Sequence, residues 1–160
     1  MAFFETVISS PFVRTQQTAE LLSGTKPVVD NRAGVLQAPP EFGPQIAERR
    51  KTDPFGVAGA IISIPELREP LRAQGQALKK LVQETIDKLG DGQRALIVSH
   101  DGTMVALEKI LMNESFDQID HTYGTLEGYT IDESLQITKP DQTVGTISLY
   151  ASRWTRRWRP

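Results

Sequence analysis

The chain opens with an apolar stretch that leads directly into a helical pattern. Residues 3–9 (FFETVIS) are mostly apolar and predict a short β-strand. Pro11 ends the hydrogen-bonding ladder and suits the start of a helix. The pattern over residues 15–23 predicts a helix, which Gly24 would close as a C-cap residue. A second short strand is expected at Val28-Val29.

A regular pattern returns in the second half of the chain. Apolar side chains recur at helical spacing between residues 72 and 89, and the turn over residues 90–92 (GDG) ends that helix. Residues 95–99 (ALIVS) are almost uniformly apolar, which is typical of a parallel strand covered on both faces. A further helix is expected over residues 103–112. This alternation predicts an α/β fold.

The remaining segments are less regular. Residues 30–65 hold five prolines and several glycines, and predict loops and short helices that could cover a site. Residues 124–137 alternate enough for one or two strands, and residues 146–150 predict a last one. We therefore expect a single domain over residues 1–150, with a mainly parallel sheet flanked by helices, and a basic tail over residues 151–160.

The composition narrows the class of protein. A chain of 160 residues with 39% hydrophobic and 24% charged residues suits one soluble domain with a proper core. The net charge of −2 gives no sign of a nucleic-acid or membrane partner. The absence of cysteine excludes disulfides and thiolate chemistry. No signal peptide is recognisable and no apolar run approaches the ~20 residues that span a bilayer, so a cytoplasmic protein is expected.

Two loops lie at positions where α/β proteins usually have their functional residues. Residues 9–14 (SSPFVR) and residues 99–102 (SHDG) each follow a strand and precede a helix, whose free backbone N–H groups favour an anion. The guanidinium of Arg14 has the donor geometry that fits a phosphate. The imidazole of His100 adds a titratable group at the end of a buried strand. The two loops together predict a pocket for a phosphoryl group.

The same two segments carry a resemblance to a known family. SSPFVRTQQTAELL resembles the second motif of the histidine phosphatase superfamily, the phosphoglycerate mutase-like group, and LIVSHDGTM resembles its late Ser-His-x-Gly motif. The resemblance covers about residues 4–24 and 72–112. It implies a phosphoglycerate mutase-like fold in which Arg14 and His100 contact the phosphoryl group. Ser10 and Gly102 would complete the phosphate site, while Ser99 has a structural role.

The nucleophile of that family is not found in this sequence. The family uses a histidine in an Arg-His-Gly motif on a preceding strand, and neither His100 nor His121 lies in such a motif. Three explanations remain open: a fragment of a longer protein, a non-catalytic relative, or a permuted chain whose C-terminal segment supplies the absent strand. A fragment would expose apolar strand faces and should associate with itself. His121 is interpreted as a polar loop residue. The alternative is that it replaces the missing nucleophile.

The identity of the residue that would donate a proton in the reaction is also undecided. Many members of the family use a glutamate in a loop after the second helix, and Glu41 is the nearest candidate by position. Glu48, Glu66 and Glu69 are alternatives, and each can equally be a solvated carboxylate. The three consecutive basic residues at positions 49–51 (RRK) are interpreted as a solvent-exposed surface rather than as a second phosphate site.

The expected function is metal-independent and cofactor-free hydrolysis of a phosphomonoester or a phosphohistidine, in a small molecule or a phosphoprotein. It would pass through a phosphohistidine if the complete protein contains the nucleophile segment. A non-catalytic phosphate-binding relative and a phosphoglycerate-mutase-type phosphotransferase are the alternatives. The tail, with four arginines and two tryptophans, could bind nucleic acid or a membrane surface, but it is more simply a loosely packed end.

Overall fold

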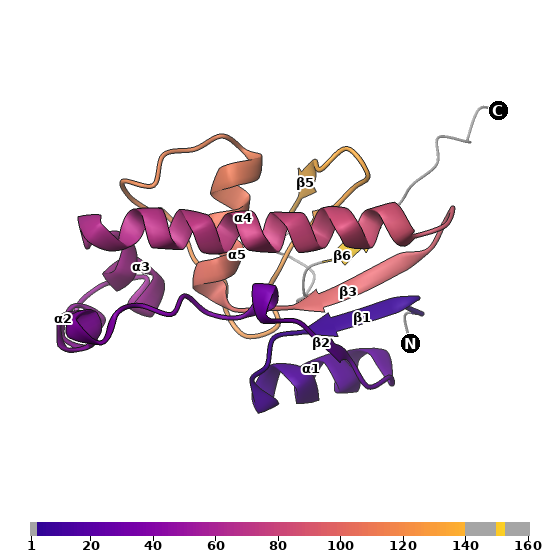
Figure 1. The fold of residues 1–160 in the computed structure, drawn as a ribbon, viewed down its shortest axis with the longest axis horizontal. Coiled ribbons are helices and arrows are strands. Elements are labelled where there is room, and N and C mark those ends of the chain that lie inside the picture. The colour runs from indigo at the N-terminus through magenta and orange to yellow at the C-terminus, as the bar shows by residue number, and fades with distance from the viewer. Residues whose placement is uncertain (1–2, 140–149, 153–160) are drawn as a thin grey trace.

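The fold is a mixed sheet with helices on both faces (Figure 1). The structure is a computed structural model that describes residues 3–139 and 150–152. Its six strands have the order β2-β1-β3-β6-β4-β5. Their bounds are β1 Thr6–Ser9, β2 Val28–Val29, β3 Arg94–Val98, β4 Thr130–Ile131, β5 Ile137–Thr138 and β6 Tyr150–Ser152.

The helices complete the architecture around this sheet. They are α1 Val13–Ser23, α2 Gly43–Arg49, α3 Gly56–Ile62, α4 Pro65–Lys88 and α5 Asp101–Leu111, with 3₁₀ turns η1 Asn31–Ala33 and η2 Pro40–Phe42. In Figure 1, α1 lies on one side of β1 and β3, and α4 lies on the other. Within the described residues, no helix is long and apolar enough to cross a membrane.

The two faces of the sheet are buried by alternate residues of the same strands. Val7 of β1 and Leu96 of β3 pack with Ala19 of α1. Their neighbours Ile8 and Ile97 belong to the larger core that α4 and α5 cover. Because strand side chains point to opposite faces in turn, a strand buried on both sides must be apolar throughout. This explains the unbroken apolar run that predicted β3.

The α/β class expected from the sequence is confirmed, with boundaries that shift by a few residues. β1, β2, β3, α1 and α5 lie where the pattern predicted them, and Gly24 closes α1 in the left-handed conformation at φ 70°. The helix expected at residue 72 instead begins at Pro65 and contains Pro70. The proline removes one backbone donor, but the hydrogen bonds of the rest of this 24-residue helix and the buried face of α4 outweigh that loss.

Parallel pairing is confirmed where it bears on the two loops. β1 pairs in parallel with both β2 and β3, and β4 pairs in parallel with β6. The β3–β6 and β4–β5 pairs are antiparallel, so the sheet as a whole is mixed. The predicted short helices of residues 30–65 are present as two α-helices and two 3₁₀ turns.

The C-terminal strand lies inside the sheet rather than at its edge. β6 pairs with β3 on one side and β4 on the other. β6 therefore lies between β3 and β4, antiparallel to the first and parallel to the second. The strand predicted over residues 146–150 lies mostly outside the described residues, and the domain boundary predicted at residue 150 falls within β6. The tail over residues 153–160 also lies outside them.

Close contact between α4 and α5 gives the first prediction. A Cβ atom on Gly75 would lie 2.7 Å from Cδ1 of Ile110 and 2.9 Å from the carbonyl carbon of Ala106. Overpacking costs about 1–3 kcal/mol, while the better helix propensity of alanine returns at most about 1 kcal/mol. We therefore expect Gly75→Ala to lower the free energy of unfolding by about 1–2 kcal/mol in urea denaturation.

A matched control is available at Gly43. A Cβ atom there meets nothing within 4 Å, and the backbone is already helical. Gly43→Ala should leave the free energy of unfolding within about 0.5 kcal/mol of the parent value or raise it slightly. Equal stability of the Gly75→Ala and Gly43→Ala variants would refute the close packing of α4 on α5.

Candidate functional site

The candidate site lies where two neighbouring parallel strands end. Ser9 of β1 is in register with Val98 of β3, and the backbone N–H of Ser10 donates to the carbonyl of Val98 at 3.1 Å. Each strand is followed within a few residues by a helix, α1 after β1 and α5 after β3. The loops that precede these helices therefore meet at one edge of the sheet, which is the usual location of ligand sites in α/β folds.

Both helices begin without a capping side chain. The residues that precede them, Phe12 before α1 and His100 before α5, have extended backbones and make no side-chain cap hydrogen bond. At α5, the Asp101 carboxylate accepts from the backbone N–H of Gly102 at 2.8 Å. The first turn of α1 contains no acidic residue, so the positive end of that helix is left for another anion.

A chain of hydrogen bonds fixes the ring of His100. Arg14 Nη2 can only donate, so His100 Nδ1, 3.4 Å away, is the acceptor. In the neutral ring Nε2 then carries the proton and donates to Ser10 Oγ at 2.8 Å. Ser10 Oγ lies 2.6 Å from Thr15 Oγ1, which donates to the carbonyl of Phe12 at 2.8 Å. In this buried series of hydrogen bonds, each donor is therefore matched with an acceptor.

Arg14 is held at the rim of the site without a carboxylate partner. Its side chain is exposed, and its guanidinium lies 5.1 Å from the ring centre of Phe12. The Phe12 ring in turn meets the His100 ring edge-on, with centroids 4.9 Å apart. Among the residues that the structure describes, Arg14 forms no salt bridge. Its donors are therefore available to an anion that enters beside His100.

Arg14, Thr15 and His100 line a cavity of about 390 Å³, which is within the range of small-molecule sites. Its walls come from the first turns of α1, the end of β3, the start of α5 and residues 123–127. Arg14 is the one basic side chain, other than His100, that lines it among the described residues. Asp101 and Glu127 are the two carboxylates.

The structure brings together some of the residues singled out from the sequence and separates others. Arg14 and His100 line the cavity, and Ser10 lies behind His100 as its hydrogen-bond acceptor. Gly102 is in the first turn of α5, where a Cβ atom would make only an ordinary 3.8 Å contact with Ala58. Glu41 is exposed in η2 and is not among the residues that line the cavity.

The remaining predicted residues have structural partners. Ser99 lines the cavity, but its hydroxyl donates to the carbonyl of Ala33 at 2.8 Å, which fits the structural role expected of it. Glu48 pairs with Lys51 at 2.6 Å. The guanidinium of Arg49 donates to the carbonyl of Ser63 at 2.7 Å. None of the charge run at residues 49–51 lines the cavity, in keeping with its interpretation as surface.

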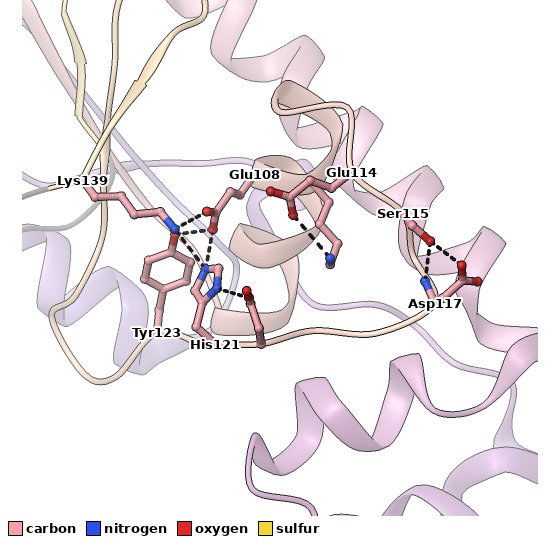
Figure 2. A network of polar contacts seen from close by, with 9 residues as sticks. Glu108, Glu114, Ser115, Asp117, His121, Tyr123 and Lys139 are labelled. Carbon is pink, nitrogen blue, oxygen red and sulfur yellow. Dashed lines mark hydrogen bonds and ion pairs between the residues drawn. The ribbon is translucent and has the colours of Figure 1, made fainter.

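Sequence reasoning missed a second polar cluster, which is centred on Glu108 of α5 (Figure 2). The carboxylate of Glu108 is almost fully buried, and it accepts hydrogen bonds from His121 Nε2 at 2.7 Å and Tyr123 Oη at 2.5 Å. It also pairs with the Lys139 ammonium. His121 Nδ1 lies 2.6 Å from Asp120 Oδ1. Among the described residues, no group of three or more His, Asp or Glu side chains is arranged to hold a metal.

This cluster connects α5 to the wall of the cavity. Tyr123 both binds Glu108 and lines the cavity, and Thr122 beside it donates to Asp101 at 3.5 Å. His121 is therefore tied to two carboxylates and does not line the cavity. The one sequence signal for the cluster is Glu108 itself, an acidic residue within the apolar run of α5.

The environment of His100 gives a prediction about its titration. Burial and the nearby Arg14 guanidinium both disfavour the imidazolium and hold the pKa of His100 below its ordinary value of 6.5. A ¹H–¹⁵N NMR titration should show a midpoint below 6.5, and Arg14→Ala should move it upward. The unfolded chain binds this proton at higher pH than the folded one, so His100 lowers stability as the pH falls below 6.5. A midpoint at or above 6.5 would contradict the buried, Arg14-facing ring.

No protein-family model, curated protein or solved structure matches this chain.

Proposed function

We propose that the cavity binds a single phosphoryl group and that the protein hydrolyses a phosphomonoester or a phosphohistidine. One observation carries this proposal. The Arg14 guanidinium, which has no carboxylate partner among the described residues, is at the start of α1 and lies 3.4 Å from Nδ1 of the histidine that precedes α5. A guanidinium donor, an imidazole and the N-terminus of α1, whose first turn holds no acidic residue, form a binding environment for a phosphoryl dianion. The histidine phosphatase resemblance of the two loops supports the same chemistry.

The charges around the cavity favour a phosphatase over a mutase. A mutase must hold a second phosphate, which calls for further basic side chains. Here Arg14 is accompanied in the lining by two carboxylates, Asp101 and Glu127, which repel an additional anion. A substrate with one phosphoryl group, in a small molecule or on an exposed side chain of a phosphoprotein, fits this balance of charge.

The proposal is tested by hydrolysis of p-nitrophenyl phosphate without added metal, by the purified chain and by its His100→Ala variant. Turnover that disappears in the variant supports the phosphatase. No turnover, together with saturable vanadate binding that Arg14→Ala abolishes, would favour the non-catalytic binding protein. Neither turnover nor vanadate binding would overturn the proposed phosphoryl site.

A further inference from the structure

Three hydroxyl groups of the cavity lining are already engaged by the protein itself. Thr15 Oγ1 donates to the carbonyl of Phe12 at 2.8 Å and lies 2.6 Å from Ser10 Oγ. The hydroxyls of Thr18 and Ser99 each donate to a backbone carbonyl at 2.8 Å. These three side chains therefore build the wall of the cavity and have little hydrogen-bonding capacity left for a ligand.

The two carboxylates of the lining are engaged to different degrees. Both oxygens of Asp101 accept hydrogen bonds, one from the backbone N–H of Gly102 at 2.8 Å and the other from the hydroxyl of Thr122 at 3.5 Å. Glu127 accepts through Oε2 from the backbone N–H of Gly124 at 2.7 Å. Its Oε1 atom has no hydrogen-bond donor among the described residues. Glu127 is thus held in place by one oxygen and has the other available for a ligand.

Arg14 and Glu127 are the two charged groups of the cavity with capacity left for a ligand. The guanidinium has five N–H groups, and its one described hydrogen bond uses Nη2, toward His100 Nδ1. Within the described part of the chain, neither Arg14 nor Glu127 forms an ion pair, with each other or with a third residue. A cation and an anion in one lining, each without a counter-ion, are complementary to a ligand that carries both charges.

The total charge of the lining points to the same kind of ligand. One guanidinium and two carboxylates line the cavity, and the lowered pKa of His100 keeps its ring neutral at neutral pH. The lining therefore has an excess of negative charge. A phosphoryl dianion that enters alone adds to this excess, whereas a positive group on the same molecule offsets part of it.

Resting on the proposed function, we infer that the substrate is a zwitterionic aminoalkyl phosphate, whose phosphoryl group binds Arg14 and whose protonated amine binds Glu127. Glu127 is then the residue that determines specificity. Thr125 lies in the same wall segment and offers a hydroxyl oxygen as a second acceptor for the amine. Met104 and Leu126 add apolar surface to the lining, which suits the short alkyl chain between the two charges.

The other role that a carboxylate could have here is to protonate the leaving oxygen of the ester. A proton donor affects kcat for every phosphomonoester, with or without an amine. It gives no preference for an amine among ligands that cannot be hydrolysed. Binding of non-hydrolysable ligands therefore separates recognition of the amine by Glu127 from proton transfer.

The test compares phosphonates, which report affinity without a leaving group. Isothermal titration is carried out at alkaline pH, where the phosphonates are mostly dianionic and the amines are still protonated. We expect the parent chain to bind aminoethylphosphonate or aminopropylphosphonate about 3- to 10-fold more tightly than the corresponding alkylphosphonate, as for a partly exposed charged contact. Phosphonoacetate, which has a carboxylate in place of the amine, should bind most weakly.

Substitutions at Glu127 then assign the preference to this residue. Glu127→Gln keeps an acceptor for the Gly124 N–H and should bring the ratio of the amino to the alkyl dissociation constant close to one. Glu127→Lys should reverse the order, so that phosphonoacetate binds more tightly than aminoethylphosphonate. Glu20→Gln is the matched control, because Glu20 is an exposed residue of α1 that does not line the cavity. Its ratio should equal that of the parent chain.

The outcomes distinguish this inference from the proposed function. Equal binding of the amino and alkyl phosphonates by the parent chain would overturn the inference, while hydrolysis of p-nitrophenyl phosphate would leave the phosphatase standing. A preference that survives in Glu127→Gln would overturn it as well, and loss of that preference in Asp101→Asn would transfer the amine to Asp101. Absence of both hydrolysis and vanadate binding would refute the proposed function, and this inference with it.

Discussion

Replacing Arg14 with alanine is expected to weaken the binding of inorganic phosphate about 10- to 100-fold and to lower kcat/KM for p-nitrophenyl phosphate by at least as much. A hydrogen bond to a charged group contributes about 1.5–3 kcal/mol, and 1.4 kcal/mol corresponds to tenfold in affinity. Arg14 has no carboxylate partner among the described residues, so the substitution leaves no unpaired acid behind. The loss therefore reports on the anion together with the contact that Arg14 makes with His100 Nδ1.

The measurement is isothermal titration with phosphate and with vanadate, combined with steady-state kinetics. Arg14→Lys should recover only part of the affinity, because an ammonium cannot present the planar pair of donors that matches two phosphoryl oxygens. Arg50→Ala is the matched control. It removes the same charge from an exposed residue that does not line the cavity, so the dissociation constant should stay within about twofold of the parent value. Equal affinity in the Arg14→Ala and Arg50→Ala variants would remove Arg14 from the site.

The part of the site that follows from local sequence could be predicted. Strand β3 was recognisable because both of its faces are buried, which requires an unbroken apolar run. The Ser-Ser-Pro turn and the Ser-His-Asp-Gly turn were recognisable because each joins a strand to a helix within a few residues. Parallel pairing of β1 with β3 then brings Arg14 and His100 to the same edge of the sheet. That juxtaposition followed from the α/β alternation alone.

The part that depends on distant contacts could not be predicted. The start of α4 was missed because Pro70 normally argues against a helix, and only its packing on η1, α3 and α5 reveals that the helix continues through it. The buried chain from His100 through Ser10 to Thr15 joins residues 90 and 5 positions apart. Local periodicity carries no signal for such a contact, because it reflects burial and not which polar atoms meet.

The contacts of the Glu108 cluster likewise could not be predicted from the local sequence. Its donors come from residues 13, 15 and 31 positions further along the chain, as the numbering of His121, Tyr123 and Lys139 gives. An acidic residue in an apolar helix signals that a partner exists, but not which one. The tertiary fold supplies that partner from the segment that also forms the cavity wall.

Replacing Glu108 with alanine is expected to lower the free energy of unfolding by about 2–4 kcal/mol at pH 7. The change removes the acceptor for Tyr123, His121 and Lys139 and leaves a void under α5. Part of the loss is offset because the buried carboxylate no longer has to be desolvated and because Lys139 and His121 can reach water. Glu108→Gln keeps the volume and one acceptor oxygen, so its loss should be smaller, about 1–2 kcal/mol.

The pH dependence of this loss separates the charge from the packing. Burial alone would raise the pKa of Glu108, but the hydrogen bonds from Lys139, Tyr123 and His121 outweigh it and hold the pKa below its ordinary value of 4.5. The ionised carboxylate therefore stabilises the fold fully above pH 4.5, and this contribution disappears as the pH falls through the lower folded-state pKa. Urea denaturation should show Glu108→Gln approaching the parent stability below pH 4.5, while Glu108→Ala keeps the deficit of its void.

The control for this series is Glu48→Gln, which removes the same charge from an exposed pair with Lys51. Its effect should stay within about 0.5 kcal/mol at every pH. A Glu108→Gln deficit that persists unchanged at acid pH would show that the hydrogen-bonded charge is not what stabilises α5 against residues 121–123. If the cluster does hold the cavity wall, Glu108→Ala should also weaken phosphate binding at pH 7, although residue 108 itself does not line the cavity.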